Sequence, residues 1–397
     1  MAVWQIIRLG EIVSTNQSTY SPKEDWKFVN YLDTGNITMN RVDEIQYINN
    51  LTDKLPSRAR RKVKLNSIIY STVRPNQLHY GIIKEQPDNF LVSTGFVVID
   101  VDFEKVVPDY IYYVLTQQAI TEHLQAIAEQ SVSAYPSIKP SDVENLELLL
   151  PDRKTQEKIV AILSSIDKKI KQNNEINNNL LVQVQLQFEQ IYSKGVLSKI
   201  SDLVSEIESG SRPKGGALTS GIPSIGAEKI ERFGFYDYSS EKYISEEYFV
   251  KLKRGIVHSS DVLLYKDGAY TGKVSMALDD FPHAKCAVNE HVFILRTKEY
   301  KYQSYLYCCL AKKEIRDTVF ALGSSKAAQP GLNKNEILGI EINIPNQIEL
   351  LDFEGFASPI MRLVAENAKQ NRELSNLRDS LLPKLMSGEL DVSNIDF

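Results

Sequence analysis

The sequence predicts an α/β (α+β) fold in which two structurally similar globular domains are separated by two long antiparallel coiled-coil helices. Three observations predict it. Segments 133–151 and 327–345 repeat one pattern of residue types, other matched segments occur in the same order in both halves, and each half ends in a long stretch with heptad spacing. Similarity at a fixed period of about half the 397-residue chain indicates an internal repeat.

The repeat begins with the segments SAYPSIKPSDVENLELLLP and AAQPGLNKNEILGIEINIP, which match in kind more than in identity. Pro136 aligns with Pro330 and Pro151 with Pro345, at an offset of 194 residues. Apolar strands can match by chance, but a shared order at offsets that drift only through loop insertions favours a duplication. Four further pairs follow at offsets of 191 to 195: LGEIVS (9–14) with ISDLVS (200–205), NSIIYSTVRPN (66–76) with DVLLYKDGAYT (261–271), TGFVVID (94–100) with NEHVFIL (289–295), and YIYYVL (110–115) with YLYCCL (305–310).

These segments indicate the elements of each half. The 66–76 and 261–271 segments are apolar runs that end in turn residues, which is typical of a strand entering a loop. The segments at 94–100 and 289–295 predict another strand, and those at 110–115 and 305–310 each open a short helix. Each half is therefore expected to contain both strands and helices.

A long helix is predicted at the end of each half. Residues 153–193 contain no proline or glycine, and Pro383 is expected to end the second helix, which covers 347–382. Ordinary surface helices with one core face remain the alternative. Steps of four and three predict a coiled-coil seam that in the first helix runs through Ile159, Leu163, Ile166, Ile170, Asn173, Asn177, Leu180 and Val184, and in the second through Phe353, Phe356, Ile360, Leu363, Asn367, Gln370, Leu374, Leu377 and Leu381.

Asn173 and Asn367 are equivalent at the offset of 194 residues. A polar residue on a seam costs stability but selects register and partner. Each helix of forty residues would be roughly 60 Å long. The expected segments are a first globular domain at 1–150, a spacer helix at 151–195, a second globular domain at 196–344 and a second spacer helix at 345–397.

Composition excludes several classes of protein. The 43% hydrophobic and 24% charged residues are ordinary for a soluble globular protein, and no run of eighteen apolar residues predicts a membrane span. The first residues lack the pattern of a signal peptide. The three cysteines form neither a disulfide framework nor a CxxC pattern, which predicts a cytoplasmic protein. The sequence contains no HExxH or HxH pattern, so no zinc site is expected.

The strongest local charge lies in residues 54–84, which hold eight basic residues and no acidic one, whereas the whole chain has a net charge of −5. Such an excess predicts a phosphate-binding face. A solvated basic strand with a structural turn is the alternative. The expected DNA-backbone contacts are Arg58, Arg60, Arg61, Lys62 and Lys64, and the turn that follows offers Thr72, Arg74, Asn76, Gln77, His79 and Tyr80, which include side chains that read base edges.

The corresponding loop of the second half is YKDGAYTGKVS. It is not a P-loop, because Val274 follows Lys273 where serine or threonine would stand. Short polar connectors elsewhere could lie along a DNA groove or serve only as links. The candidates for DNA binding here are Lys266, Tyr270, Thr271 and Lys273, the loop residues Arg212 and Lys214, and the connector residues Ser133, Tyr135, Ser325, Lys326 and Gln329.

Catalysis finds no support in the sequence. The NPP[YF] and FxGxG patterns of an amino-methyltransferase are missing. PDRK at 151–154 starts like a nuclease motif, but Asp152 precedes a long helix and is more simply its N-cap. Asp279 and Asp280 are adjacent, so their side chains point in different directions. No set of nucleophile, base and orienting residue is present.

Several segments follow one another in a characteristic order: RLGEIV and KISDLV, PSRARRKVKLNSIIYSTVRPN, DVLLYKDGAYTGKVS with AVNEHVFIL, LLPDRKTQEKIVAILSSIDKKIKQNNEINNNL, and LRDSLLPKLMSGEL. In these segments and their order the chain resembles the specificity subunit of a type I restriction–modification system, over essentially all 397 residues. The second copy differs in lacking the Gln-x-x-Ile pattern found at Gln156–Ile159.

The resemblance implies a non-catalytic reader of double-stranded DNA. Each globular half would be a target-recognition domain for one part of a bipartite sequence, and the helices would set the spacing and dock two methyltransferase subunits. S-adenosylmethionine would belong to those subunits, which flip adenine out of the duplex, and ATP and magnesium to a restriction–translocase subunit. No cofactor or metal is expected on this chain. The alternatives are a stand-alone DNA-modifying enzyme and a coiled-coil scaffold without nucleic acid.

Overall fold

The computed structural model describes residues 4–130, 136–324 and 331–395. The chain forms two compact units. Unit 1 comprises Met1–Asp167 together with Asn376–Phe397, and unit 2 comprises Lys168–Ser375. Both chain ends thus belong to unit 1. The four segment boundaries expected from the sequence stay predictions. No helix in the described part of the chain is long and apolar enough to cross a bilayer.

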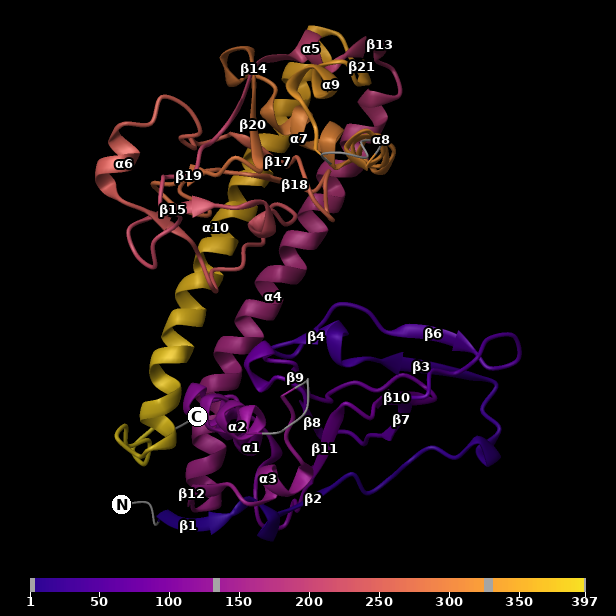
Figure 1. Ribbon diagram of the computed structural model, residues 1–397, viewed down its shortest axis with the longest axis vertical. Coiled ribbons are helices and arrows are strands. Elements are labelled where there is room, and N and C mark those ends of the chain that lie inside the picture. Colours follow the sequence, from indigo (N-terminus) through magenta and orange to yellow (C-terminus); the bar gives the residue numbers. More distant parts are fainter. Residues whose placement is uncertain (1–3, 131–135, 325–330, 396–397) are drawn as a thin grey trace. The chain divides into compact units, whose positions relative to one another are not determined.

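The described part of unit 1 contains two four-stranded sheets and two two-stranded ones (Figure 1). Its strands are β1 (Trp4–Arg8), β2 (Val13–Thr15), β3 (Phe28–Leu32), β4 (Ile37–Thr38), β5 (Arg41–Val42), β6 (Gln46–Asn49), β7 (Ala59–Lys62), β8 (Ile68–Ser71), β9 (Tyr80–Ile82), β10 (Phe90–Ser93), β11 (Phe96–Val101) and β12 (Glu147–Pro151). Its short helices are α1 (Pro108–Leu115), α2 (Gln118–Glu129) and α3 (Pro140–Glu144), with 3-10 turns at η1 (Leu9–Glu11), η2 (Pro22–Glu24), η3 (Thr34–Asn36) and η4 (Pro75–Gln77).

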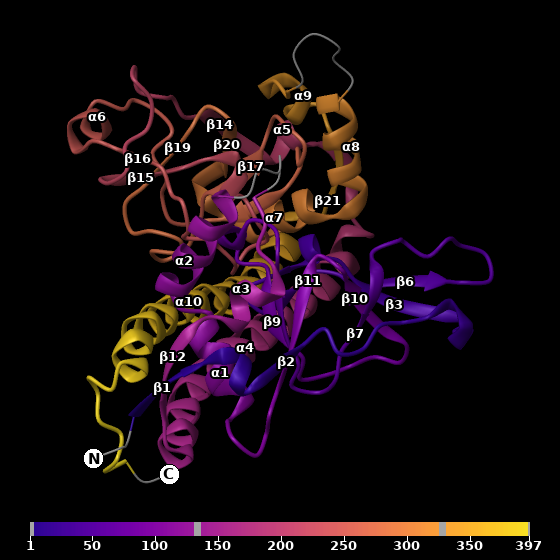
Figure 2. The same ribbon diagram turned by 60° about the horizontal axis from the view of Figure 1, so that its bottom comes forward.

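The sheets of unit 1 form two layers. One has the order β2-β11-β8-β9 and packs against the short helices, and the other has the order β6-β3-β10-β7. Only β3 and β10 pair in parallel there. Figures 1 and 2 both show the second sheet on the side away from α1 and α2. The separate pair β1–β12 joins the N-terminal strand to the strand before the first long helix.

Unit 2 repeats this architecture. Its strands are β13 (Val196–Lys199), β14 (Val204–Ser209), β15 (Ile222–Ile225), β16 (Tyr243–Ile244), β17 (Val262–Tyr265), β18 (Val274–Met276), β19 (Ala287–Val288), β20 (Val292–Thr297) and β21 (Glu341–Ile344). Its helices are α5 (Ile200–Leu203), α6 (Glu246–Val250), α7 (Gln303–Ala311), α8 (Lys313–Ser324) and α9 (Lys334–Leu338), with 3-10 turns at η5 (Ala227–Lys229) and η6 (Lys298–Tyr300).

The helix-side sheet and the terminal strand pair correspond strand by strand in the two units. The order β14-β20-β17-β18 repeats β2-β11-β8-β9, and β13–β21 repeats β1–β12. The second sheet, β16-β15-β19, again holds one parallel pair, β15 with β19. The duplication and the mixed fold are therefore confirmed.

A buried tyrosine makes the same contact in both units. In unit 1 the hydroxyl of Tyr110 on α1 donates to the carbonyl of Leu149 on β12 (3.0 Å). In unit 2 the hydroxyl of Tyr305 on α7 donates to Asn343 on β21 (2.7 Å). A buried phenol needs such a partner. The tyrosine therefore fixes the helix to the last strand in each copy.

The sequence alignment of β8 with β17 is wrong by one position. It places Tyr70 over Tyr265, but Tyr70 faces the helix-side core, as does Leu264 in unit 2, whereas Tyr265 packs on the other face. Side chains alternate between faces along a strand, so a slip of one residue exchanges them. The correct alignment places Tyr70 over Leu264, and the matching tyrosines are a coincidence of sequence.

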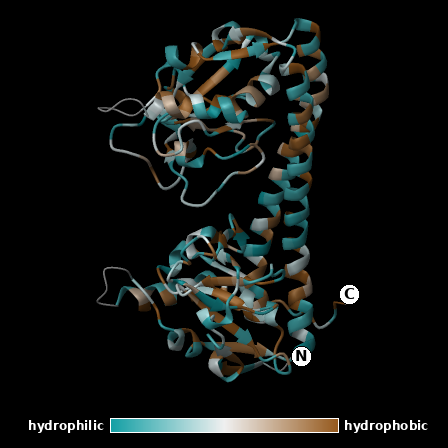
Figure 3. Cartoon of the chain, turned by 90° about the vertical axis from the view of Figure 1, so that its right-hand side faces the viewer, coloured by the Kyte–Doolittle hydropathy of each residue, from teal (hydrophilic) through white to brown (hydrophobic). Residues whose placement is uncertain are grey.

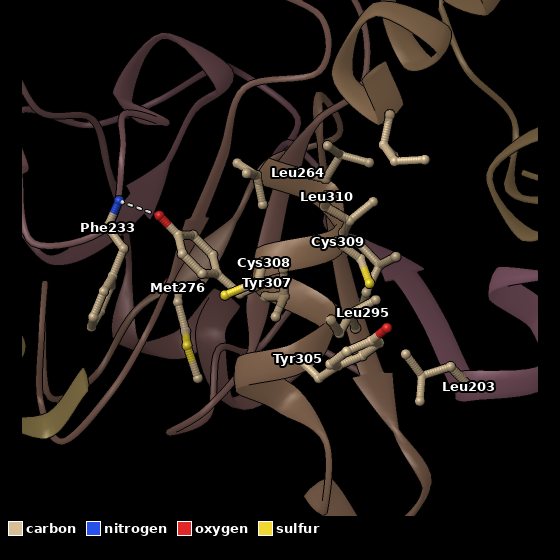
Figure 4. Packing of buried hydrophobic residues seen from close by; sticks show 14 of the residues in the cluster. Leu203, Phe233, Leu264, Met276, Leu295, Tyr305, Tyr307, Cys308, Cys309 and Leu310 are labelled. Atoms are coloured by element: carbon tan, nitrogen blue, oxygen red, sulfur yellow. Dashed lines mark hydrogen bonds between the residues drawn. The ribbon is translucent and has the colours of Figure 1, made fainter. Parts of the chain in front are cut away.

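The helix-side core of unit 2 is centred on α7 (Figure 4). Side chains from α7 meet those of β17, β18, β20 and α5 there, including Cys308 and Cys309, which are buried free thiols. The hydroxyl of Tyr307 accepts a hydrogen bond from the backbone N–H of Phe233 (3.4 Å). These cysteines act as small apolar core residues.

The two long helices are α4 (Arg153–Tyr192) and α10 (Gln347–Met386), which pack together (Figure 1). Asp152 accepts a hydrogen bond from the backbone N–H of Thr155 (3.1 Å), which confirms it as the N-cap of α4. The two helix starts occupy equivalent positions of the repeat, although Gln156 has no counterpart in α10. In unit 1 the amide of Gln156 bridges Val107 and Pro151.

The end of α10 differs from the sequence prediction. The helix continues through Pro383 to Met386 instead of stopping at the proline. Pro359 also lies inside it. Both prolines are exposed, so the backbone carbonyls that lose a donor can be hydrated. Residues Leu382, Leu385 and Met386 then pack in the core of unit 1, which stabilises the last turn.

The seam positions differ in burial. Phe356, Leu363 and Leu377 are exposed, so the heptad read for α10 includes residues that do not face α4. Figure 3 shows apolar and polar residues mixed along both helices. Of the seam residues expected from the sequence, Ile159, Ile166, Asn173 and Phe353 are buried, and Ile170, Leu180, Ile360, Asn367 and Leu374 are half-buried.

Asparagines form a polar layer between the helices within unit 2. The amide of Asn367 donates to the side-chain oxygen of Asn177 (2.8 Å), and the amide of Asn173 donates to that of Asn371 (2.9 Å). The repeat relates Asn173 to Asn367 and Asn177 to Asn371. The two hydrogen-bonded pairs, Asn177 with Asn367 and Asn173 with Asn371, are therefore equivalent to each other. This layer is antiparallel, because the α10 partner number falls as the α4 number rises. Asn173 also donates to Gln370 (2.8 Å).

Candidate nucleic-acid interface

The turn between β8 and β9, residues 72–79, is a rigid polar loop. Its centre is the 3-10 turn η4, and Arg74 and Leu78 on either side of η4 both have positive φ, 49° and 58°. The backbone N–H of Asn76 donates to the side chain of Gln125 on α2 (3.2 Å), and that of Arg74 donates to Pro136 (3.0 Å). Contacts from α2 and from the segment after it therefore fix this turn.

The turn between β17 and β18, residues 266–273, has the same length and shares three backbone hydrogen bonds with the β8–β9 turn, although the N–H of Gly272 donates to Tyr265 (2.9 Å) where that of Leu78 donates to Pro75 (3.0 Å). Its Gly268 and Gly272 have positive φ, 129° and 96°, at the positions of Arg74 and Leu78. The two turns are thus copies of one structure. Three hydrogen bonds recur at equivalent positions of the repeat: Ser71 N to His79 O (2.9 Å) with Tyr265 N to Lys273 O (2.9 Å), Gln77 N to Arg74 O (2.9 Å) with Thr271 N to Gly268 O (3.3 Å), and Ile138 N to Thr72 O (2.8 Å) with Leu332 N to Lys266 O (3.0 Å).

The side chains on the two turns differ although the backbones agree. Unit 1 presents exposed Arg74, Asn76 and Gln77. Unit 2 has Gly268 in place of Arg74 and an exposed Tyr270 in place of Asn76. A non-glycine residue in the left-handed region costs roughly 1–2 kcal/mol. Unit 1 thus keeps a long charged side chain where the copied backbone favours glycine.

The basic strand β7 is less free than its sequence indicates. Lys62 forms an ion pair with Glu24 and lies over the Trp26 ring (5.1 Å to the centroid). Lys64 lies 3.5 Å from Asp100. Cations that are already paired bind phosphate less well, because the existing pair must open or share its charge. Lys62 and Lys64 are therefore weaker candidates than the sequence predicted.

The arginines of this segment keep more of their charge available. Arg58 is exposed, and Arg60 and Arg61 are half-buried on β7. The Nε of Arg61 is buried without a hydrogen-bond partner among the described residues. Desolvation by burial raises the pKa of the Asp33 carboxyl, but hydrogen bonds from Ser93, Thr34 and Tyr31 outweigh it and lower that pKa. The nearby charge of Arg58 adds to the lowering. These three guanidinium groups stay candidates for phosphate contacts.

Several turn residues expected to face DNA are structural. Tyr80 is only 4% exposed and stacks on Tyr70 (centroids 5.6 Å apart), so its ring belongs to the core. His79 bonds through Nδ1 to the carbonyl of Ile37 (2.6 Å). The hydroxyl of Thr72 donates to Gly95 (2.9 Å). Every residue of β9 is buried, and Tyr80 lies in the helix-side core, which the sequence prediction overlooked.

The candidates of unit 2 are also partly occupied. Thr271 is buried and its hydroxyl donates to Gly268 (2.8 Å), so it is withdrawn from the surface set. Lys273 pairs with Glu231 (2.7 Å) and Arg212 with Glu290 (2.9 Å). The Nζ of Lys266 lies 4.0 Å from Asp267 and 5.1 Å from the Phe293 ring centroid. Tyr270 and Lys214 are exposed. The connector residues Ser133, Tyr135, Ser325, Lys326 and Gln329 lie outside the described residues.

Sequence reasoning missed the hairpin β4–β5 of unit 1. Its two-residue loop, Met39–Asn40, is hydrogen-bonded to the β8–β9 turn through Met39 N and Leu78 O (2.9 Å). Asn40 was the one cue to such a hairpin in the sequence, because asparagine favours the left-handed region that a type I′ turn requires. Methionine at the first loop position hid the signal.

The described residues hold no group of three or more His, Cys, Asp or Glu side chains that could bind a metal ion. The comparisons with known proteins point to one class. Residues 1–182 match the family described as the type I restriction modification DNA specificity domain. The chain is 25% identical to the type I restriction enzyme HindI specificity subunit of Haemophilus influenzae, over 98% of this chain and 100% of that protein. Residues 1–182 thus carry a type I restriction–modification DNA specificity domain, and the whole chain is similar to specificity subunits.

Two further comparisons agree with that family. The type I restriction enzyme MjaIX specificity subunit of Methanocaldococcus jannaschii is 24% identical, over 99% of this chain and 94% of that protein. A crystal structure of a type I restriction–modification S subunit from M. genitalium shares the fold, with a TM-score of 0.55 and 15% identity over 99% and 97% of the two chains. A specificity subunit is a non-catalytic part of a complex, and a scaffold or stand-alone enzyme is not favoured.

Proposed function

We propose that each unit of this specificity subunit reads one part of a bipartite DNA target, using the β8–β9 turn in unit 1 and the β17–β18 turn in unit 2. In unit 1, Arg74, Asn76 and Gln77 would contact base edges, because arginine pairs with guanine and the amides pair with adenine. Arg58, Arg60 and Arg61 would contact phosphates and hold the unit in register.

One observation carries this proposal. The two turns share their length, three backbone hydrogen bonds and their two left-handed positions, yet they present different side chains. A duplicated scaffold that keeps its backbone and varies its exposed residues is what two different half-sites would require.

The long helices are proposed as the spacer and as the docking surface for methyltransferase subunits. Apolar residues on both helices are exposed to solvent, which favours burial by a partner. S-adenosylmethionine would be bound by those partners, and ATP with magnesium by a restriction–translocase subunit, in the cytoplasm. The exposed apolar residues are Ile176, Val182 and Leu186 on α4 and Ile348, Leu351, Phe356, Leu363 and Leu377 on α10.

The test is to co-express the chain with its cognate methyltransferase subunit and to map methylated adenines by long-read sequencing. The proposal predicts one target made of two defined parts with an undefined gap. In binding assays with the purified complex, log affinity should fall steeply with log salt concentration, because phosphate contacts release counterions. A continuous target, or binding that does not depend on salt, would refute the proposal.

A further inference from the structure

The tip of the β4–β5 hairpin holds a methionine in a backbone conformation that methionine rarely adopts. The strands are joined by Met39 and Asn40 alone, and both residues have positive φ, 49° and 63°. A two-residue loop of this kind favours glycine, asparagine or aspartate. Asn40 fits that preference, whereas Met39 does not. A glycine at position 39 would form the same loop without strain.

The hairpin is held against the β8–β9 turn and strand β9. The backbone N–H of Asn40 donates to Tyr80 (2.8 Å), and its side-chain oxygen accepts from the N–H of Ile82 (2.9 Å). Gly81 makes the approach possible, because a Cβ there would lie 2.7 Å from the Asn40 oxygen and 2.7 Å from Ile37. Together with the bond from Met39 to Leu78, these contacts fix the tip beside the turn.

The Met39 side chain has no evident task within unit 1. It is 47% exposed and belongs to none of the buried clusters. Unit 2 has no corresponding hairpin among its described strands, and Ser275 stands at the position equivalent to Gly81. The hairpin is thus a feature of one copy, placed beside the residues proposed to read DNA, with an apolar side chain at its tip.

We propose that Met39 makes an apolar contact with the bases of the DNA duplex, next to the bases read by Arg74, Asn76 and Gln77. The inference rests on the proposed function and adds a specificity residue to it. The thioether side chain is flexible and polarizable, so it adapts to a base surface. Apolar side chains read the thymine methyl group or enter a base step, which charged and amide groups do less well.

The test compares three variants of the full chain in complex with its methyltransferase subunit. Met39→Gly removes the side chain and the strain, Met39→Leu keeps an apolar side chain, and Asn89→Gly is the control. Asn89 has a similar φ of 52° in the same unit, but it precedes β10 and lies on neither the hairpin nor the turn. The probe is a synthetic duplex that carries the target sequence identified by methylation mapping. A duplex of scrambled sequence is measured beside it.

Met39→Gly is expected to bind the target about tenfold more weakly than the wild type, because one apolar side-chain contact is lost. Its binding to the scrambled duplex should be unchanged. Its melting temperature should equal or exceed that of the wild type, because strain is removed. This combination separates loss of a DNA contact from loss of the fold. Met39→Leu should bind within about twofold of the wild type, and Asn89→Gly should bind like the wild type.

A second arm replaces thymine by uracil in the half-site read by unit 1. If the uracil duplex binds the wild type more weakly than the thymine duplex does, and Met39→Gly shows no such difference, Met39 contacts the thymine methyl group. Equal binding to both duplexes, with Met39→Gly still weak, supports contact with a base step. If Met39→Gly binds the target with the affinity of the wild type, the inference is wrong and Met39 does not contact the DNA. A wild-type complex that binds the target and the scrambled duplex equally overturns the proposed function instead.

Discussion

Arg74 occupies a left-handed backbone position in a turn whose copy in unit 2 uses Gly268 there. An arginine at such a position is less stable than a glycine. The position is exposed and lies in the loop after a buried strand, where binding residues are commonly found. Both features agree with the proposed contact of Arg74 to a base edge.

Arg74→Ala is expected to relax or abolish recognition of one half-site and to leave the other unchanged. The lost discrimination should be about 1–3 kcal/mol, the value of a bidentate arginine–guanine pair. Methylation mapping in cells that express the variant complex measures the change. Lys84→Ala is the control, because Lys84 is in the same basic segment but pairs with Asp109 (2.8 Å). An unchanged methylation pattern for Arg74→Ala contradicts the assignment.

Glu354 on α10 provides a test of stability in unit 2. Burial raises the pKa of Glu354 to about 7, although its carboxylate accepts a hydrogen bond from the backbone N–H of Tyr305 (2.8 Å). The folded pKa lies above the usual 4.5, so between about pH 5 and 7 the folded state binds more protons than the unfolded state. Stability from this group therefore falls as pH rises through that window.

Glu354→Gln should reduce this pH dependence, because the neutral amide can still accept the Tyr305 bond. The expected result is a melting temperature that exceeds that of the wild type at pH 8 by more than at pH 5. Thermal unfolding at the two pH values measures it. Parallel pH profiles for wild type and variant would show that the carboxyl titrates near its ordinary pKa.

At the scale of elements, the amide layer between α4 and α10 replaces apolar contacts with hydrogen bonds. Asn177 is buried, donates to the carbonyl of Val364 (3.1 Å) and accepts from Asn367 (2.8 Å). Buried amides favour the one helix register in which their partners meet. The layer therefore contributes specificity of packing more than stability.

Asn177→Leu should lower the free energy of unfolding by about 1–3 kcal/mol, because it leaves the half-buried Asn367 amide without its partner. The double variant Asn177→Leu and Asn367→Leu should recover most of the loss, since both polar groups are then removed. Urea unfolding of the three proteins measures the coupling. Additive losses in the double variant would indicate that the two side chains act independently.

The two copies stabilise one strand junction with different charges. In unit 2, Arg296 on β20 binds Asp261 through two hydrogen bonds (2.7 Å each) and also contacts Glu208 (2.9 Å). Unit 1 has Asp100 and Ser67 in this place. Burial raises the pKa of Asp261, against the opposing effect of Arg296. A buried pair of this kind depends on both partners.

Asp261→Ala is expected to destabilise the protein by about 3–5 kcal/mol, because Arg296 keeps a buried charge without its main partner. Glu247→Ala is the matched control. It removes the exposed pair with Lys251 (2.7 Å) and should change stability by no more than about 0.5 kcal/mol. Denaturant unfolding compares the two. Equal losses would show that the Asp261 pair is no more important than a surface pair.

The sequence predicted the elements better than the surface. Repeats of residue type located the duplicated strands and helices, because local pattern determines them. It missed the strand register by one residue, since Tyr70 and Tyr265 look alike. It could not show that Glu24 and Asp100 neutralise Lys62 and Lys64, because those partners come from distant segments that only the fold brings close.

At the scale of the whole molecule, the chain contains one fold twice, and the side chains that differ between the copies include those on the two turns. A subunit built in this way is expected to read two sequences that are unrelated to each other. Net charge is a poor guide here, because eight of the 46 lysines and arginines lie in residues 54–84 without an acidic residue among them. Acidic residues from other segments, Glu24, Asp100 and Asp109, balance part of that charge.

The central claim is that the two units read separate parts of the target. The most direct measurement is to replace residues 1–150 with the corresponding segment of another family member, express the hybrid with the methyltransferase subunit, and map methylated adenines by long-read sequencing. The account predicts that one part of the target changes while the other part stays the same. A hybrid that changes both parts, or neither, would contradict it.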